Sequence, residues 1–182
     1  GVRAAGGAGG GVVYLLRLRY GEPHLVWGLW GRWGEVWYRV EEFYYDSRRE
    51  GRQKTDSEYA DALEALADGR PIREVVADPS AASFLECLRR RGWQVRRAEN
   101  EVLSGIRTTA ELLRTGRLVI CPGCGDAIRE FGLYRWDTSA GGRDQVCKEH
   151  DHAMDDIRYF AVTVAAKERG GSWAGSVERR IF

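Results

Sequence analysis

The sequence has no apolar run long enough to cross a membrane, since a membrane-spanning helix needs about 20 consecutive apolar residues. The short apolar stretch that follows Gly11 runs directly into Arg17 and Arg19. A secretory signal peptide needs a longer apolar core followed by a small-residue cleavage site, so this stretch does not fit one. We therefore expect a cytoplasmic chain that has no membrane partner.

An excess of charge of one sign is also missing. The chain carries 28 Lys and Arg against 27 Asp and Glu, a net charge of +1. A balanced total neither requires nor excludes a nucleic-acid partner, because binding depends on local basic patches. The chain lacks the G-x-x-x-x-G-K-[S/T] phosphate loop as well, so we expect no ATP hydrolysis from it.

Cysteine is scarce, with four residues. In a cytoplasmic chain these are thiols or metal ligands rather than a disulfide framework. Cys121 and Cys124, followed by Cys147 and His150, come close to the spacing of a structural zinc site. The alternative is a pair of small residues at a helix start and an unrelated thiol. Cys87 lies in an amphipathic pattern and is most simply a core residue.

The patterning that is present predicts a mixed α/β domain over residues 12–168, with a Gly/Ala-rich segment at 1–11 and a tail at 169–182. Strand patterns at 12–19, 25–30 and 35–45 predict an antiparallel meander, with a hairpin turn at 31–34. Helical periods follow at 56–67, 79–91, 101–114, 127–133 and 148–167, with strands at 72–77, 93–97 and 118–120 and a loose hairpin at 135–146. Three antiparallel strands followed by parallel strands with crossover helices are the order of a ribonuclease H-like fold.

The first candidate site residue is Asp78, which follows the strand at 72–77 directly. An acid at the carboxyl end of such a strand lies at the edge of an α/β sheet where ligands usually bind. The other interpretation is a helix start, with Asp78 as the cap and Pro79 at the first helical position.

A second acidic cluster opens the last predicted helix. Asp151 and Asp155 are one turn apart on one face, and His152 is beside Asp155 at i,i+3. Cleavage of a phosphodiester by two metal ions needs carboxylates that converge from different elements. The alternative is a solvated helix face whose acids favour the helix dipole.

Together these segments resemble the C-terminal nuclease domain of the large terminase subunit of tailed phages, the motor that packages and cuts viral DNA. The matching stretches run in order through 42–46, 51–56, 76–84, 105–107, 128–131, 134–137 and 148–155. The strings Asp-Pro-Ser-Ala-Ala-Ser-Phe from Asp78 and Asp-His-Ala-Met-Asp from Asp151 are the most specific.

The resemblance implies that Asp78 is the second catalytic acid and Asp155 the third, with Asp151 and His152 close to two Mg²⁺ or Mn²⁺ ions. It also implies a chain without zinc. The family's first acid stands in an Asp-Tyr-Gly context, and the matching stretch here places Arg19 in that position. An arginine repels a metal ion, so we expect impaired cutting.

The function implied is metal-dependent endonucleolytic cleavage of double-stranded DNA. Partners in the full-length protein would be an ATPase domain, the portal and the small terminase subunit. Two alternatives stay open: a remnant that binds DNA or a partner without cutting, and a zinc-stapled binding module. A polar basic loop that contains Arg48, Arg49, Arg52 and Lys54 is expected to face DNA, and a second basic stretch lies at a helix end. The candidate DNA contacts are Arg52, Lys54, Arg89 and Arg90, although cations also favour a helix end.

Overall fold

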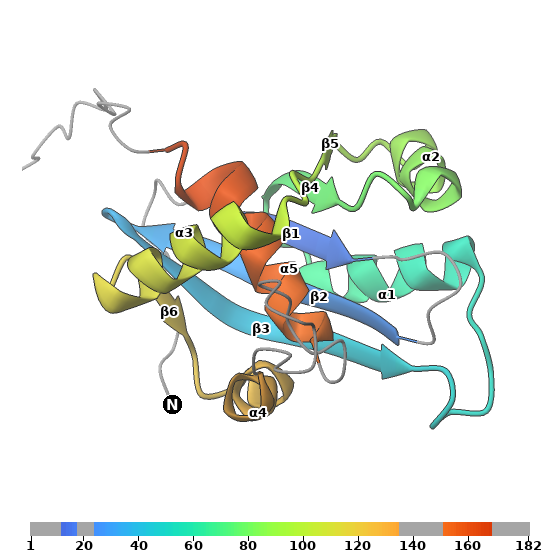
Figure 1. Cartoon of the computed structure of the whole chain (residues 1–182). Helices are drawn as coiled ribbons and strands as arrows, with labels where there is room; N and C mark the ends of the chain where they lie inside the picture. The colour runs from blue at the N-terminus through green and yellow to red at the C-terminus, as the bar shows by residue number, and fades with distance from the viewer. Residues whose placement is uncertain (1–11, 18–23, 135–150, 169–182) are drawn as a thin grey trace, which may run out of the picture.

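The computed structural model describes residues 12–17, 24–134 and 151–168. Within them, six strands form one mixed sheet in the order β5-β4-β1-β2-β3-β6 (Figure 1). The strands are β1 (Val12–Arg17), β2 (His24–Trp33), β3 (Val36–Asp46), β4 (Ile72–Ala77), β5 (Val95–Arg97) and β6 (Leu118–Ile120). β1, β2 and β3 are antiparallel, whereas β4 pairs parallel with β1, β5 with β4 and β6 with β3. The predicted mixed sheet, three antiparallel strands followed by parallel ones, is confirmed.

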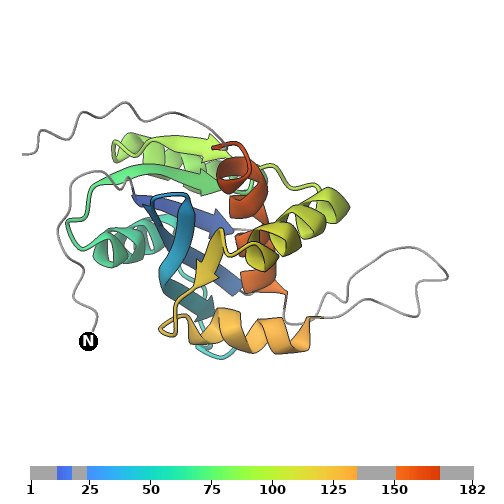
Figure 2. The ribbon, with the colours of Figure 1, turned by 90° about the vertical axis from the view of Figure 1, so that its left-hand side faces the viewer.

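Helices cover both faces of the sheet. One face carries α1 (Asp56–Ala67) and α2 (Ala82–Arg90); the other carries α3 (Val102–Arg114), α4 (Gly125–Leu133) and α5 (His152–Phe160). Figure 2 shows the sheet between these two layers. A π-helical segment, Ala161–Ala165, extends α5.

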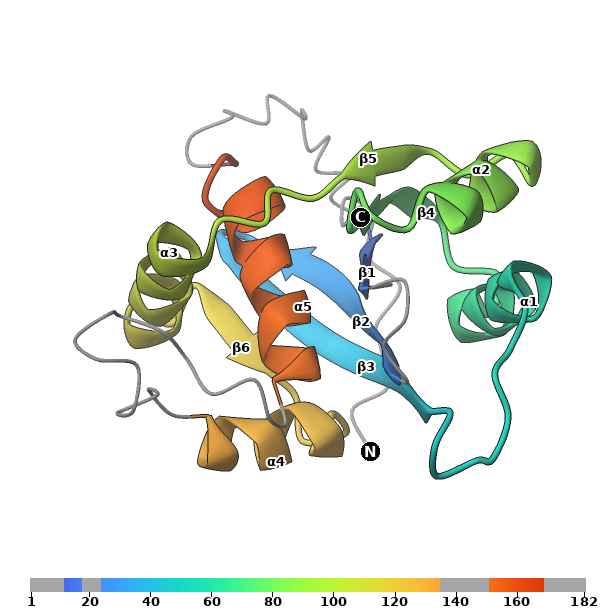
Figure 3. The same ribbon diagram turned by 45° about the vertical axis from the view of Figure 1, so that its right-hand side comes forward.

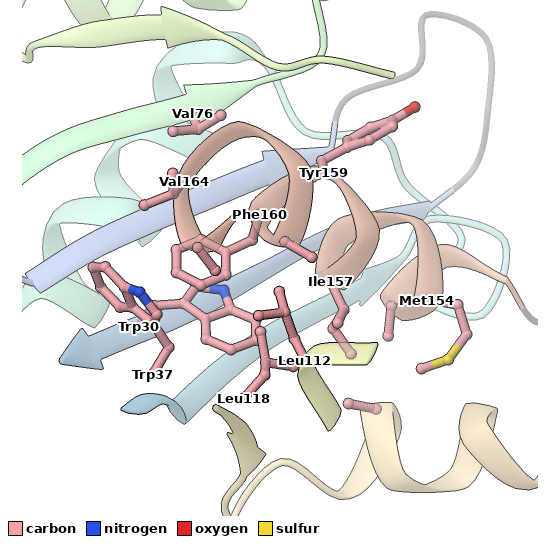
Figure 4. Packing of buried hydrophobic residues seen from close by; sticks show 14 of the residues in the cluster. Trp30, Trp37, Val76, Leu112, Leu118, Met154, Ile157, Tyr159, Phe160 and Val164 are labelled. Carbon is pink, nitrogen blue, oxygen red and sulfur yellow. The ribbon is translucent and has the colours of Figure 1, made fainter. Parts of the chain in front are cut away.

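β2 explains the two layers, because both of its faces are buried. Leu25, Trp27 and Leu29 face the core beneath α1 and α2, while Val26 and Trp30 face the core beneath α5. Such a strand has near-continuous apolar character. Beneath α5, the ring of Phe160 stacks on Trp30 at a centroid distance of 4.0 Å (Figure 4).

Several predicted boundaries were wrong by a few residues. The hairpin turn lies at 34–35, because β2 continues through Trp33. Thr55, rather than Asp56 or Ser57, caps α1, in a reciprocal capping box with Glu58. α2 begins only at Ala82. In the last predicted helix, α5 starts at His152 and the regular α-helix ends at Phe160.

Other predictions fall on residues that the structure does not describe. These are the segments 1–11 and 169–182, the hairpin at 135–146 and the first residues of the last predicted helix, so the domain boundaries stay a prediction. Within the described ranges, none of the helices is long and apolar enough to span a membrane.

Candidate metal-dependent nuclease site

The candidate acids of the site lie at one edge of the sheet. Ala77 at the end of β4 pairs with Leu16 of β1, Leu16 pairs with Trp27 of β2, and Trp27 pairs with Phe43 of β3. The carboxyl ends of β4, β1 and β3 and the start of β2 therefore share this edge. Figure 3 shows α5 lying across the sheet, with α3 and α4 on the same side.

Asp78 leaves the sheet at this edge and is 5% exposed. One carboxylate oxygen accepts a hydrogen bond from the amide of Ser80 at 2.8 Å, and the other accepts one from the hydroxyl of Tyr159 at 3.0 Å. Because α2 begins at Ala82, with Ala81 at the cap position, Asp78 is not a helix cap. Its side chain instead connects β4 to α5.

The acids of α5 lie along the helix face that carries Tyr159. The amide of Asp155 donates to the carbonyl of Asp151 at 2.8 Å, so Asp151, Asp155 and Tyr159 occupy successive turns. Side chains one turn apart are neighbours, and Tyr159 reaches Asp78. The structure thus brings Asp78 to the same face of α5 as Asp155.

The interpretation of these acids as a solvated helix face is wrong. Asp151 is 6% exposed and Asp155 is 8% exposed. Ionised carboxylates are rarely buried without a partner, and for Asp155 that partner is Arg158.

Arg158 is the partner that sequence reasoning missed. Its Nη2 lies 3.0 Å from one carboxylate oxygen of Asp155, and its Nη1 donates to the carbonyls of Asn100 and Glu101 at 2.9 and 2.7 Å. The guanidinium, 3% exposed, therefore holds the Asp155 carboxylate in one orientation. The i,i+3 spacing from Asp155 was the signal available in the sequence.

His152 stacks on His24, with ring centroids 4.1 Å apart. His24 in turn contacts Asp46, Nε2 to Oδ2, at 3.1 Å, and His152 lies 3.8 Å from Asp151. Desolvation raises the pKa of Asp46, but hydrogen bonds from the amides of Arg49 and Arg48, together with His24, bring it below the usual value. His24 was not predicted, because it becomes a neighbour of His152 only through the fold.

A buried polar network fixes the position of α5. Glu130 is fully buried on α4 and accepts from the amide of Ala153 at 2.6 Å and from the hydroxyl of Tyr44 at 2.8 Å. Burial raises the pKa of Glu130. Asp156 pairs with the fully buried Arg39 of β3. The contact with Glu130 supplies a hydrogen-bond acceptor for a backbone amide in the first turn of α5. Together with the Asp156–Arg39 pair it orients the acidic face of the helix.

The donor set fits a hard divalent ion only in part. Mg²⁺ and Mn²⁺ favour carboxylate oxygens, and Asp78 and Asp155 supply them from two elements. Within the described ranges, however, no group of three or more His, Cys, Asp or Glu is arranged to hold a metal ion. The first-acid position, Arg19, lies outside the described residues, two positions beyond the last described residue of β1.

The cysteines are described in part. Cys87, Cys121 and Cys124 are free thiols. Cys124 is buried and donates to the carbonyl of Arg39 at 3.3 Å, and burial raises the pKa of its thiol to about 12. A zinc ligand must be a thiolate. Cys147 and His150 lie outside the described residues, so the predicted absence of zinc stays a prediction.

The candidate DNA contacts lie in two separate places. Arg52 pairs with Glu58 at 2.5 Å, and Lys54 lies over the ring of Tyr45. Arg89 and Arg90 are the last residues of α2, which starts beside Asp78, and Arg90 pairs with Glu86. A helix of this length carries its end about 13 Å from its start, so these two arginines lie away from the acidic edge.

A mixed sheet of this order, with acids at the edge under α5, defines a ribonuclease H-like domain, and solved structures share it. The large terminase of a thermophilic bacteriophage, solved in complex with ADP, is 39% identical, with a TM-score of 0.78 over 83% of this chain and 39% of that one. The large terminase (g2p) nuclease domain of bacteriophage SPP1 with bound Mn is 17% identical, with a TM-score of 0.61 over 82% of this chain and 84% of that one. The large terminase nuclease of the thermophilic phage G20c with bound magnesium is 16% identical, with a TM-score of 0.60 over 84% and 82%.

The chain is therefore a relative of phage large terminases and corresponds to their nuclease domain, as the sequence indicated. It spans about two fifths of the large terminase solved with ADP. The two isolated nuclease domains, at lower identity, support the fold. No protein-family model matches the chain, and no curated protein matches it.

Proposed function

We propose that the chain is the metal-dependent endonuclease domain of a viral DNA-packaging terminase and that its substrate is double-stranded DNA. The observation that carries the proposal is the approach of Asp78, from the end of β4, to the acidic face of α5 through Tyr159. Two acids from different elements at one edge are what a hydrolytic metal site needs. Nuclease domains of the same fold that were solved with Mn or magnesium bound support the choice of ion.

Asp78 and Asp155 would hold Mg²⁺ or Mn²⁺, with Asp151 or His152 beside them. When bound, two such ions activate a water molecule and stabilise the leaving oxygen. Tyr159 keeps the Asp78 carboxylate pointed toward α5, and Arg158 occupies one oxygen of Asp155. The rest of the proposed assembly, an ATPase domain, portal and small subunit in the host cytoplasm, belongs to the full-length protein.

A second candidate function is DNA or partner binding without cutting. The observation that favours it is Arg19, which stands where the resemblance places the first acid. A guanidinium there removes a ligand and adds a charge like that of the metal. Only the first of the two functions includes cleavage of DNA, so a cleavage assay separates them.

The test is nicking of supercoiled plasmid in Mn²⁺ or Mg²⁺ by the chain, by Asp78→Asn and by Asp155→Asn. We expect weak, metal-dependent nicking that both substitutions abolish. Asp61→Asn is the matched control, because Asp61 is an exposed acid on α1, in the opposite layer. Nicking that survives both site substitutions, or that proceeds in EDTA, would contradict the proposal. No nicking by the unmodified chain would favour the binding remnant.

A further inference from the structure

The segment that joins β3 to α1 is a turn organised around Asp46. One carboxylate oxygen of Asp46 accepts from the amides of Arg48 and Arg49 at 2.9 and 3.2 Å. Its carbonyl accepts from the amide of Glu50 at 3.0 Å, and Gly51 closes the turn with a φ of 66°. An Asp that bonds the following amides fixes such a turn, so the backbone that carries Arg48 and Arg49 is preorganised.

Two of the four cations in the loop that the sequence predicted to face DNA, Arg52 and Lys54, hold the far end of the turn. The hydroxyl of Tyr45 donates to the carbonyl of Arg52 at 2.7 Å, and Arg52 pairs with Glu58. Lys54 lies 4.8 Å from the centroid of the Tyr45 ring. Both cations are therefore engaged in the structure of the turn itself.

Arg48 and Arg49 differ from them. Both are exposed, and neither makes an ion pair with any residue in the described ranges. Two guanidinium groups are thus presented to solvent from a fixed backbone, with Glu50 as the one exposed acid among residues 47–51. Arginine side chains presented in this way are suited to phosphate oxygens.

The turn is also joined to the acidic edge by direct contacts. Asp46 contacts His24 at 3.1 Å, and His24 stacks on His152, the residue that follows Asp151. A polyanion that approaches buried carboxylates is repelled unless cations lie beside its path. Arg48 and Arg49 are the exposed cations that this chain of contacts places next to the site.

We propose that Arg48 and Arg49 bind backbone phosphates of duplex DNA beside the acidic edge and so hold the substrate at the site. This inference rests on the proposed function for its choice of substrate. Phosphate contacts set the position of a protein on DNA without reading its sequence. The turn is therefore a positioning element, and the hydrolytic chemistry belongs to the acids.

The test measures binding alone. A fluorescent 30-base-pair duplex is titrated in EDTA, where no metal supports cutting, at several salt concentrations from 50 to 200 mM. Each phosphate contact contributes about 0.9 to the slope of log affinity against log salt. We expect Arg48→Gln/Arg49→Gln to lower that slope by about 2 and to weaken binding at 50 mM salt by about tenfold or more.

The comparison variant is Arg89→Gln/Arg90→Gln, which makes the same charge change at the end of α2. We expect it to keep the slope of the unmodified chain, because the end of α2 lies away from the acidic edge and Arg89 and Arg90 therefore do not reach DNA held there. An unchanged slope in the Arg48 and Arg49 variant, an equal loss in both variants, or no duplex binding by the unmodified chain overturns the inference. Thermal unfolding of each variant should match the unmodified chain, because the substituted side chains are exposed.

The two proposals fail in different ways. If the Arg48 and Arg49 variant shows a smaller slope of log affinity against log salt but the unmodified chain never nicks DNA, this inference is supported and the proposed nuclease activity is contradicted. If the unmodified chain nicks DNA in the presence of metal but the Arg48 and Arg49 variant binds duplex normally, the proposed nuclease activity is supported and this inference is contradicted.

Discussion

The hydroxyl of Tyr159 donates a hydrogen bond to the carboxylate of Asp78 at 3.0 Å, across 81 positions of sequence. The aromatic ring belongs to the core beneath α5, and Figure 4 shows the hydroxyl pointing away from the cluster of Trp30 and Phe160. Tyr159 thus packs on the sheet with its ring and orients an acid with its hydroxyl. This one side chain couples the position of α5 to the geometry of the candidate site.

Replacing Tyr159 with Phe tests that coupling. The ring and its packing stay, but the buried carboxylate of Asp78 loses a donor, which costs about 1–3 kcal/mol. We expect urea denaturation to show that loss of stability and any Mn²⁺-dependent nicking to fall at the same time.

Tyr59→Phe is the control for this prediction, because Tyr59 is a buried tyrosine of α1 on the other face of the sheet. It should lose stability without a specific loss of nicking. Unchanged stability in Tyr159→Phe would mean that the hydroxyl contributes nothing to the position of Asp78.

The order of strands and helices along the chain was predictable because apolar runs, turns and helical periods are local signals. The order of the strands within the sheet was not predicted, because it depends on pairing between segments far apart in the sequence. The acids after β4 and at the start of α5 were predictable from motif strings. Arg158 was not predicted, although its i,i+3 spacing from Asp155 is local, because its burial and its bonds to the carbonyls of Asn100 and Glu101 depend on tertiary packing. His24 was not predicted because its contact with His152 depends on how β2 and α5 pack. The burial of Asp151 and Asp155 was likewise set by that packing and not by helical spacing.

A second prediction concerns Gly28 in β2. A Cβ at this position would lie 2.6 Å from the Cζ of Arg39 and 2.9 Å from Nε1 of Trp30, both buried. Gly28→Ala therefore has to displace Arg39 from its pair with Asp156, and we expect a loss of about 2–4 kcal/mol. Gly31→Ala is the matched control in the same strand, since a Cβ there meets no atom within 4 Å. Equal chemical-denaturation midpoints for the two variants would show that Arg39 relocates without cost.

A third prediction follows from the capping box of α1. A hydrogen bond from the amide of Thr55, followed by one from Arg52, lowers the pKa of Glu58 below its usual value of 4.5. An acid whose pKa is depressed by folding stabilises the protein above the pKa of the unfolded chain, and that contribution is lost as the pH falls through the folded value. Glu58→Gln should therefore melt earlier than the unmodified chain at pH 7, and the difference should shrink below about pH 4.5. A difference in melting temperature that stays constant down to pH 3 would contradict this origin of the stabilisation.

Because Arg158 contacts Asp155, the described residues leave few carboxylate oxygens for a metal ion. Asp155 already shares one oxygen with a guanidinium, so the metal-binding capacity of the described residues is small. A two-metal site collects several carboxylates because it must hold four positive charges at short range. The edge formed by β4, β1 and β2 is where a further carboxylate would complete the set.

Arg19→Asp should therefore raise Mn²⁺-dependent nicking of plasmid DNA. Position 19 follows the described end of β1 by two residues, and the resemblance assigns the first acid there. The substitution removes a charge like that of the metal and adds an oxygen ligand, so metal affinity should rise by at least about tenfold, measured by Mn²⁺ titration. Asp155→Ala in the Arg19→Asp chain is the control and should abolish the activity gained. Robust cleavage by the unmodified chain that is lost on Asp78→Ala would show that a residue other than position 19 supplies the first acid. Glu22, three positions after Arg19 in the sequence, would then be the first candidate.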